Sequence, residues 1–590
     1  MQIRTTTAKL DSAIHESSAK PLMSWRCALL LWLGSAVLLA AVNQYRNGPA
    51  TLADELGYLG VARWLAGAGP LPNMFDASFY HFGYSFLIAP AFWLGGNPVS
   101  AYKWVMVINC MLAATVAPLG YAFARKFFSV GHRQALLLAV IAMIYPANAA
   151  QTNFAWSENA LPALMLCWAI ILILVHERPT PTRVLLLALI PPILFFVHPR
   201  MLGIELVTLL YLVIASVVHK LGRWWYAMGC AALLLMHTLV AHALSYVRHL
   251  AYGEDHGNVS NFLHDLSQVL SRGMRLPAAA SGQIAYLSYG SQGLIILGIL
   301  TLVVVSYQLY LELRREHPTI PSLLMNPCVI LALGIASIFA ASAITMSAGF
   351  RTDHWLYGRY VDAASPILLI AGTVSALDRR RIRAFAPWLV MILCFAITLW
   401  FSFAAITQPQ QIVYNNIPTL APLIHHLQTF AGVTGIEFGV IMLLVVAPAL
   451  LFAAAGKRAV APIVAVYMLA SIITILEWPR NLVGHDAYPA PVRQIRTEID
   501  SRNLADSKIL VYRDSFSDPS YVPMSFRLQY FLDRNTVVVS SDAGAAPACP
   551  RIGTLKDLAS DEPAMGKPIH LTDNVVFWIP RVPAGSVRCK

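Results

Sequence analysis

Two adjacent carboxylates, Asp54 and Glu55, stand in a mostly apolar run between positions 51 and 65. A carboxylate held beside a hydroxyl can take its proton, so the pair offers a general base with an acidic partner. Acidic residues are also favoured in the first turn of a helix, where the helix dipole is positive, and a capping role is therefore the alternative.

Glu158, in the run Trp156-Ser157-Glu158-Asn159, is a third candidate carboxylate. Its alternative role is also local, with Ser157 as the N-cap of a following helix and Glu158 in the first turn. Nearer the first pair, the run His81-Phe82-Gly83-Tyr84 supplies two polar rings. We take His81 and Tyr84 as candidate substrate contacts, with a hydrogen-bonded interfacial histidine as the alternative.

Arginines set among aromatic residues are candidates for binding a phosphate, because the guanidinium fork matches two phosphate oxygens. The segment between positions 351 and 360 holds Arg351, Tyr357, Arg359 and Tyr360. Arg200, after His198-Pro199, is a further candidate. The alternative for all of them is an aromatic belt with arginines that reach toward the membrane surface.

The composition places these residues in a membrane protein. Of 590 residues, 57% are hydrophobic and 12% are charged, whereas soluble domains carry about 25% charged residues. A soluble enzyme, a disordered chain and a fibrous protein are thereby excluded. The formal net charge of +12 would suggest nucleic-acid binding in a soluble protein.

Apolar runs of about 20 residues predict thirteen membrane-spanning helices. They cover 27–43, 101–123, 134–150, 157–175, 183–197, 201–218, 225–247, 291–311, 326–348, 361–376, 384–405, 436–455 and 458–477. The stretch 82–94 is short and contains Gly83 and Pro90, so we expect it to lie in the interface. Leu56, Leu59 and Ala62 recur at helical spacing, which predicts a helix over 52–66 on the membrane surface.

The basic residues fix the orientation of these spans. With the N-terminus in the cytoplasm, every predicted inner loop is basic, as the positive-inside rule requires. These loops hold Arg125, Lys126, Arg133, Arg178, Arg183, Lys220, Arg223, Arg314, Arg315, Arg379, Arg380, Arg381, Arg383, Lys457 and Arg458. Much of the positive charge is thus a topology signal, and we expect no nucleic-acid partner.

The chain divides into a membrane part, residues 1–478, and a polar tail, residues 479–590. The first outer loop covers 44–100, and further outer loops lie near 148–157, 248–290, 349–360 and 406–435. In the tail, strands are predicted at 508–512, 536–540 and 575–579 and helices at 491–503 and 525–533, which indicates a small extracytoplasmic α/β domain. Cys549 and Cys589 can form a disulfide in an exported tail, with two free thiols as the alternative.

The chain resembles the membrane-embedded GT-C glycosyltransferases, which take a sugar from a polyprenyl-phosphate carrier. The resemblance rests on Asp54-Glu55 just after the first span, the long amphipathic first loop, the many spans and the exported tail. It is closest to the branch of protein mannosyltransferases, bacterial aminoarabinose transferases and arabinosyltransferases. Aminoarabinose transferases carry a Lys-Pro-Pro stretch where this chain has His81-Phe82-Gly83-Tyr84, which argues against an aminoarabinose role on lipid A.

The resemblance implies that Asp54 is the catalytic base, with Glu55 and Glu158 as acidic partners, in an inverting transfer at the outer face of a bacterial cytoplasmic membrane. Arg359, with Arg200 or Arg351, would hold the leaving phosphate. It implies a glycan, lipid or exported-protein acceptor and a sugar such as arabinofuranose or mannose. We assign no metal site and keep Mg²⁺ or Mn²⁺ as an alternative cofactor. The rival function is a transporter or flippase for lipid-linked sugars.

Overall fold

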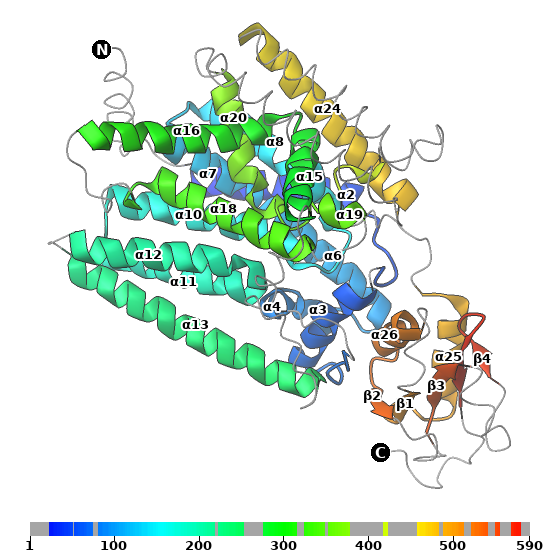
Figure 1. The fold of residues 1–590 in the computed structure, drawn as a ribbon. Coiled ribbons are helices and arrows are strands. Elements are labelled where there is room, and N and C mark those ends of the chain that lie inside the picture. The colour runs from blue at the N-terminus through cyan, green and yellow to red at the C-terminus, as the bar shows by residue number, and fades with distance from the viewer. Residues whose placement is uncertain are drawn as a thin grey trace.

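The structure is a computed structural model of the whole chain. It describes residues 23–50, 52–74, 81–218, 222–252, 275–315, 324–347, 352–377, 417–422, 457–482, 488–512, 521–540, 549–554 and 568–579. These segments form a helical bundle, with a small α/β unit of residues 488–579, hereafter the C-terminal unit, at one end (Figure 1).

The first half of the bundle runs from the first span to two long helices at one side of the molecule (Figure 1). Its elements are α2 (Trp25–Val42), α3 (Leu52–Leu65), α4 (Gly83–Ile88), α5 (Pro90–Leu94), α6 (Pro98–Ala114), α7 (Val116–Phe128), α8 (His132–Met143), α9 (Pro146–Gln151), η1 (Ser157–Asn159), α10 (Leu161–Glu177), α11 (Pro181–Val197), η2 (Pro199–Met201), α12 (Leu202–Val218) and α13 (Arg223–Tyr252).

The second half of the bundle packs on the first. Its elements are α15 (Arg275–Gly290), α16 (Leu294–Arg315), α18 (Pro327–Met346), α19 (Thr352–Trp355), η3 (Asp362–Ala364), α20 (Ser365–Leu377) and α24 (Lys457–Leu482). Large apolar side chains are exposed along α13, among them Leu234, Leu235 and Leu239.

Most predicted spans coincide with helices. Within the described residues, five helices are long and apolar enough to cross a membrane, or six if the bent pair α15 and α16 counts as one span. The remaining predicted spans in this part match shorter apolar helices, while those at 384–405 and 436–455 lie outside the described residues. The protein is therefore a multi-pass membrane protein, and the count of thirteen spans stays a prediction.

One predicted loop contains a helix. Residues 248–290 were expected to be an outer loop, but α15 occupies their last part and meets α16 at an angle of 117°. The break falls at Ser291-Gln292-Gly293, where Gln292 and Gly293 have positive φ values of 50° and 81°. The prediction missed α15 because its sequence mixes serines, glycines and a glutamine with few large apolar residues.

The stretch 82–94, expected to lie in the interface, forms the short helices α4 and α5. They break at Ala89-Pro90, because proline lacks the amide proton needed to continue α4. The predicted helix over 52–66 is confirmed as α3, with Asp54 and Glu55 in its first turn, and most of its side chains are buried within the fold. The helices α3, α4, α5 and the start of α6 lie between the membrane bundle and the C-terminal unit (Figure 1).

The C-terminal unit contains a five-stranded sheet with the order β2-β1-β3-β5-β4. Its elements are α25 (Ala490–Ser501), β1 (Lys508–Tyr512), α26 (Tyr521–Phe531), β2 (Thr536–Ser540), β3 (Arg551–Thr554), β4 (Ile569–His570) and β5 (Val575–Trp578). The strands β1 and β2 are parallel and α26 provides the crossover between them, as a parallel pair requires. The predicted strands and helices of the tail are confirmed, whereas β3, which contains Gly553, and the two-residue β4 were not predicted.

Cys549 in the C-terminal unit is disulfide-bonded. Cys589, its expected partner, lies outside the described residues. The cysteines of the described membrane helices, Cys27, Cys110, Cys167, Cys230 and Cys328, are free thiols.

The bundle depends on close helix packing at two glycines. A Cβ atom at Gly372 would lie 1.8 Å from the backbone oxygen of Leu294, and one at Gly298 would lie 2.1 Å from that of Leu368. The helices α16 and α20 therefore touch through their backbones at both positions.

Gly372→Ala should force α16 and α20 apart and destabilise the bundle by roughly 1–3 kcal/mol, the usual cost of overpacking. Thermal unfolding of the purified protein in detergent measures the change. Gly34→Ala in α2 is the matched control, because nothing lies within 4 Å of the added methyl group. Equal unfolding temperatures for the two variants would contradict the packing argument.

Candidate active site

Four charged residues from distant parts of the chain form one buried cluster. Arg359 Nη1 donates to Asp54 Oδ2 at 2.8 Å, and Arg359 Nε donates to Glu158 Oε1 at 3.1 Å. Arg200 Nη2 donates to the same Glu158 oxygen at 2.9 Å. We call Asp54, Glu158, Arg200 and Arg359 the charge cluster. It holds two carboxylates and two guanidinium groups, so its formal charges balance.

The members of the charge cluster differ in exposure. The side chains of Glu158, Arg200 and Arg359 are nearly inaccessible, whereas the side chain of Asp54 is 33% exposed. Asp54 is therefore the member of the cluster that an incoming molecule can reach most directly.

Short irregular segments position the cluster. Asp54 lies in the first turn of α3, Glu158 in η1, Arg200 in η2, and Arg359 in the turn between α19 and η3. Each segment lies at the end of a helix, where side chains are free to converge. Ser157 does not cap α10, which begins at Leu161 after Ala160.

An aromatic stack supports Arg359. Its guanidinium carbon lies 3.9 Å from the ring centroid of Trp156, a cation–π contact. Trp156 stacks on Phe154 at 4.2 Å with an interplanar angle of 8°, and Arg46 lies 4.6 Å from the Phe154 ring. Arg200 makes the same kind of contact with Tyr360, at 4.1 Å. Both guanidinium groups are thus held over rings as well as by carboxylates.

Tyr58 supports Glu158 from α3, one turn after Asp54. Its hydroxyl donates to Ser157 Oγ at 3.1 Å, and Ser157 Oγ donates to Glu158 Oε2 at 3.3 Å. Burial raises the pKa of the Tyr58 hydroxyl, which keeps it protonated and a donor. Burial alone would raise the pKa of Glu158, but Arg359 and Arg200 hold it below its ordinary value.

Glu55 points away from the charge cluster, as expected for neighbouring residues on a helix, which lie about 100° apart. Its carboxylate is fully buried and accepts hydrogen bonds from Ala50 N at 2.7 Å, Ala155 N at 2.9 Å and the Tyr102 hydroxyl at 2.5 Å. Glu55 therefore ties the segment before α3 to the segment before Trp156.

His81 and Tyr84 make their hydrogen bonds to other parts of the fold, and the Tyr84 ring packs edge to face on the Tyr58 ring at 5.2 Å. Burial lowers the pKa of His81 to about 4, so its ring is neutral. Its Nδ1 lies 2.6 Å from the backbone oxygen of Phe195, and since that oxygen can only accept, Nδ1 carries the proton. Tyr84 is fully buried and donates to Asn109 Oδ1 at 2.6 Å. Each ring thus has a partner within the fold, the alternative we described for His81.

Of the remaining predicted residues, Tyr357 and Tyr360 lie at the site. The rings of Tyr357 and Tyr360 are 4.5 Å apart, beside Arg200 and Arg359. Arg351 lies outside the described residues.

Several supporting residues escaped the sequence prediction. Asp362 is buried and accepts from Tyr145 at 3.0 Å, Tyr286 at 3.0 Å and Gln151 at 3.4 Å, which anchors the turn that carries Arg359. A Cβ atom at Gly358 would lie 1.8 Å from the Tyr286 ring, so this turn needs glycine. Tyr58 follows Asp54 by four residues, which places both on the same face of a helix. This spacing could have identified Tyr58 from the sequence.

Donors of the protein itself bind the three candidate carboxylates in the structure. Asp54 and Glu158 both bind Arg359, and Glu55 is held by three other donors. Within the described part of the chain, no group of three or more His, Cys, Asp or Glu residues could hold a metal ion.

The fold matches known structures although the sequence does not match known families. No protein family and no curated protein matches the chain. It is similar to ArnT from Cupriavidus metallidurans bound to undecaprenyl phosphate, with a TM-score of 0.50, 15% identity and coverage of 94% of this chain and 98% of that chain. The structure of ArnT from the same organism in the apo state gives a TM-score of 0.50 at 14% identity, over 93% of this chain and 97% of that chain.

The archaeal oligosaccharyltransferase AglB from Archaeoglobus fulgidus, in complex with an inhibitory peptide and a dolichol-phosphate, gives a TM-score of 0.45 at 10% identity, over 87% of this chain and 65% of that chain. The likeness to the two ArnT structures shows that the chain shares the fold of ArnT, an aminoarabinose transferase fold of the kind that the sequence resemblance predicted.

Glu158→Gln should destabilise the protein near neutral pH by about 3–5 kcal/mol, because it leaves two buried guanidinium groups short of a charge. The folded-state pKa of Glu158 is below its ordinary 4.5. Its contribution is therefore present above about pH 4.5 and is lost as the pH falls through the folded-state pKa. We expect the unfolding temperatures of the wild type and the variant to converge in acid.

Glu498→Gln is the matched control for this measurement. It removes a carboxylate that pairs with Arg502 one helical turn away, with both side chains about 40% exposed. Such surface pairs contribute about 0.3–0.5 kcal/mol. A gap between the wild type and Glu158→Gln that stayed constant from neutral pH into acid would refute the assignment.

Proposed function

We propose that this protein is an inverting glycosyltransferase that moves a sugar from a polyprenyl phosphate to an acceptor hydroxyl. The observation that carries the proposal is the contact between Asp54 and Arg359, at 2.8 Å. It joins a partly exposed candidate base to a guanidinium group suited to phosphate. The ArnT fold supports the proposal, because ArnT has been captured with undecaprenyl phosphate.

In the proposed reaction, Asp54 accepts the proton of the acceptor hydroxyl. The acceptor oxygen forms a bond to the anomeric carbon from the face opposite the phosphate, and the bond from that carbon to the phosphate oxygen breaks. The bonding electrons leave with the polyprenyl phosphate. One displacement of this kind inverts the anomeric centre.

Arg359 stabilises the charge that develops on the departing phosphate, with Arg200 as the second cation. Arg359 is held by two carboxylates in the structure. A phosphate that binds Arg359 would take the place of Asp54 on Nη1, which releases the Asp54 carboxylate toward the acceptor. Glu158 would keep Arg359 and Arg200 in position throughout.

The other predicted residues take supporting roles in this proposal. Tyr357 and Tyr360 line the phosphate side of the site. Glu55 orders the chain around Asp54 through its three hydrogen bonds. We place His81 and Tyr84 in the framework of the first loop and leave Arg351 as a further candidate cation.

We propose that the site faces the periplasm in a bacterial cytoplasmic membrane, with residues 1–478 in the membrane part and residues 479–590 outside. The acceptor would be a glycan, a lipid or an exported protein, and the sugar a pentose such as arabinofuranose, or mannose. The basic loops on the opposite face support this orientation.

Asp54→Asn should reduce sugar transfer by at least about 10³-fold, because the amide cannot accept the hydroxyl proton and general-base catalysis is lost together with the Arg359 ion pair. Transfer from radiolabelled polyprenyl-phosphate sugars, measured with the protein in proteoliposomes, is the assay. Donor binding should persist in the variant. Turnover close to that of the wild type would remove Asp54 as the base.

The same assay separates the proposal from a flippase. A flippase would move the labelled lipid between leaflets without forming a glycosylated product. Functional charges of transporters lie deep in the membrane, whereas Asp54 and Glu158 lie in the first loop and at the end of a helix. Labelled donor that changes leaflet without any product would contradict the transferase.

We also propose that the reaction needs no divalent cation, because guanidinium groups supply positive charge to Asp54 and Glu158, and Glu55 is held by three neutral donors. Transfer should continue at its full rate in excess EDTA and should not increase on addition of Mg²⁺ or Mn²⁺. Product formation by the wild type with and without chelator measures this. A loss of activity with EDTA that Mn²⁺ or Mg²⁺ restores would show that a cation takes part.

A further inference from the structure

The helix α26 of the C-terminal unit docks on α3, whose first turn carries Asp54. Arg63, near the end of α3, donates through Nη1 to the backbone oxygen of Gln529 at 2.9 Å and of Tyr530 at 3.4 Å. Both oxygens lie in the last turn of α26, where the helix dipole is negative and favours a cation. The side chain of Gln529 donates to and accepts from the backbone of Asn73.

Arg63 is almost completely buried by this contact. Its Nη2 donates to the backbone oxygen of Pro70 at 3.2 Å, so the guanidinium links α3, the chain after α3, and α26. Burial lowers the pKa of Arg63. A buried charge of this kind is costly unless its hydrogen-bond partners stay in place. The contact between α3 and α26 is therefore expected to be rigid.

A second series of contacts connects α26 with Glu55, the residue next to Asp54 in the sequence. The Tyr530 hydroxyl donates to the backbone oxygen of Pro98 at 2.6 Å, and the Tyr530 ring meets the Tyr102 ring edge to face at 6.2 Å. The Tyr102 hydroxyl donates to Glu55. Glu55 in turn binds Ala155 N, in the segment that leads to Trp156 and Glu158.

We propose that α26 is a positioning element for the transfer reaction, with Arg63, Tyr102 and Tyr530 as its positioning residues. The inference rests on the proposed function. The helix α26 fixes the far end of α3 through Arg63. It fixes the first turn of α3 through Tyr102 and Glu55. Asp54 is thereby held against Arg359. Precision matters here, because a displacement of about 1 Å at a reacting group can lower a rate about 10²-fold.

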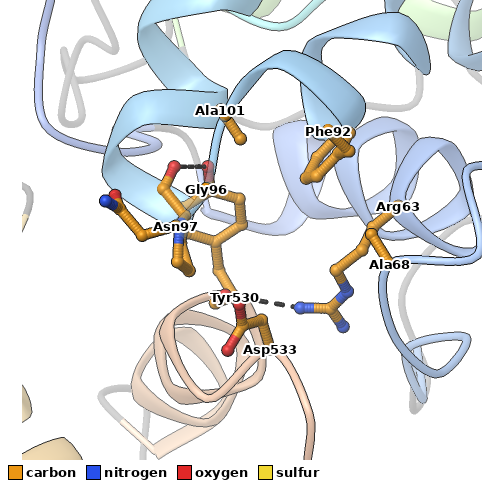
Figure 2. A pocket seen from close by; sticks show the side chains of 10 residues that line it. Arg63, Ala68, Phe92, Gly96, Asn97, Ala101, Tyr530 and Asp533 are labelled. Carbon is orange, nitrogen blue, oxygen red and sulfur yellow. Dashed lines mark hydrogen bonds between the residues drawn. The ribbon is translucent and has the colours of Figure 1, made fainter.

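A cavity beside this joint offers a competing explanation. It has a volume of about 210 Å³ and is lined by residues of the first loop and of the C-terminal unit, including Arg63, Phe92, Asn97, Tyr530 and Asp533 (Figure 2). If an acceptor bound there, loss of Tyr530 would lower activity through binding. Ala68 lines the cavity and is exposed, so Ala68→Leu narrows the cavity and leaves the Arg63 side chain in place.

The test compares Tyr530→Phe and Tyr102→Phe with the wild type in full-length protein, in the radiolabelled transfer assay. Each variant removes one hydroxyl and keeps the ring. We expect kcat to fall by about 10-fold to 10²-fold, with the KM values for donor and acceptor within about twofold of the wild type. Ala68→Leu should leave kcat and both KM values unchanged.

Arg534→Ala is the matched control in the C-terminal unit, because its ion pair with Asp506 is exposed and lies away from α3. It should not change kcat. Rates are normalised to the folded fraction, so that a loss of stability alone does not lower the measured kcat.

Two results would overturn the inference. An unchanged kcat in Tyr530→Phe and Tyr102→Phe would remove the positioning role. A higher acceptor KM in Ala68→Leu and Tyr530→Phe, with kcat unchanged, would identify the cavity as an acceptor site instead. If the wild-type protein transferred no sugar from any polyprenyl-phosphate donor, the proposed function itself would be wrong. That failure is seen in the wild type, whereas failure of the positioning role is seen only in the variants, so the two can be told apart.

Discussion

The structure depends on keeping two buried guanidinium groups neutralised. Arg359 and Arg200 are almost inaccessible, and both bind the same oxygen of Glu158. Removing such charges from water is expensive, so the surrounding chain must replace much of the lost hydration. The Trp156 and Tyr360 rings, together with the Tyr58–Ser157 pair behind Glu158, supply part of it, whereas Nε and Nη1 of Arg200 have no hydrogen-bond partner among the described residues. The four segments must therefore meet with high precision.

That requirement explains the irregular backbone around the site. Three of the four charged side chains come from irregular backbone, in η1, η2 and the turn before η3, and they meet Asp54 from the first turn of α3. The turn at Gly358 packs against the Tyr286 ring so closely that a methyl group does not fit. Asp362 then fixes the same turn through three hydrogen bonds.

Much of the site could be predicted from the sequence because topology restricts where charges lie. Once the basic inner loops fix the orientation, Asp54, Glu158, Arg200 and Arg359 all fall on one face, and charges there are few. The direction of Glu55 could not be read in this way, since it depends on which face of α3 meets Tyr102. The aromatic support from Phe154 and Trp156 depends on ring packing, which no spacing rule encodes. The helix α15 was missed because small and polar residues replaced the apolar pattern.

The polar side chains of α3 each have a separate structural task. Its first turn places Asp54 in the charge cluster and Glu55 in the framework, its middle supplies Tyr58, and its last turn supplies Arg63 to α26. A helix is rigid over this length because each turn is hydrogen-bonded to the next. A displacement of α26 relative to the bundle would therefore displace Asp54 by nearly the same distance. The chemistry of the site and the docking of the C-terminal unit are thus joined in a single element.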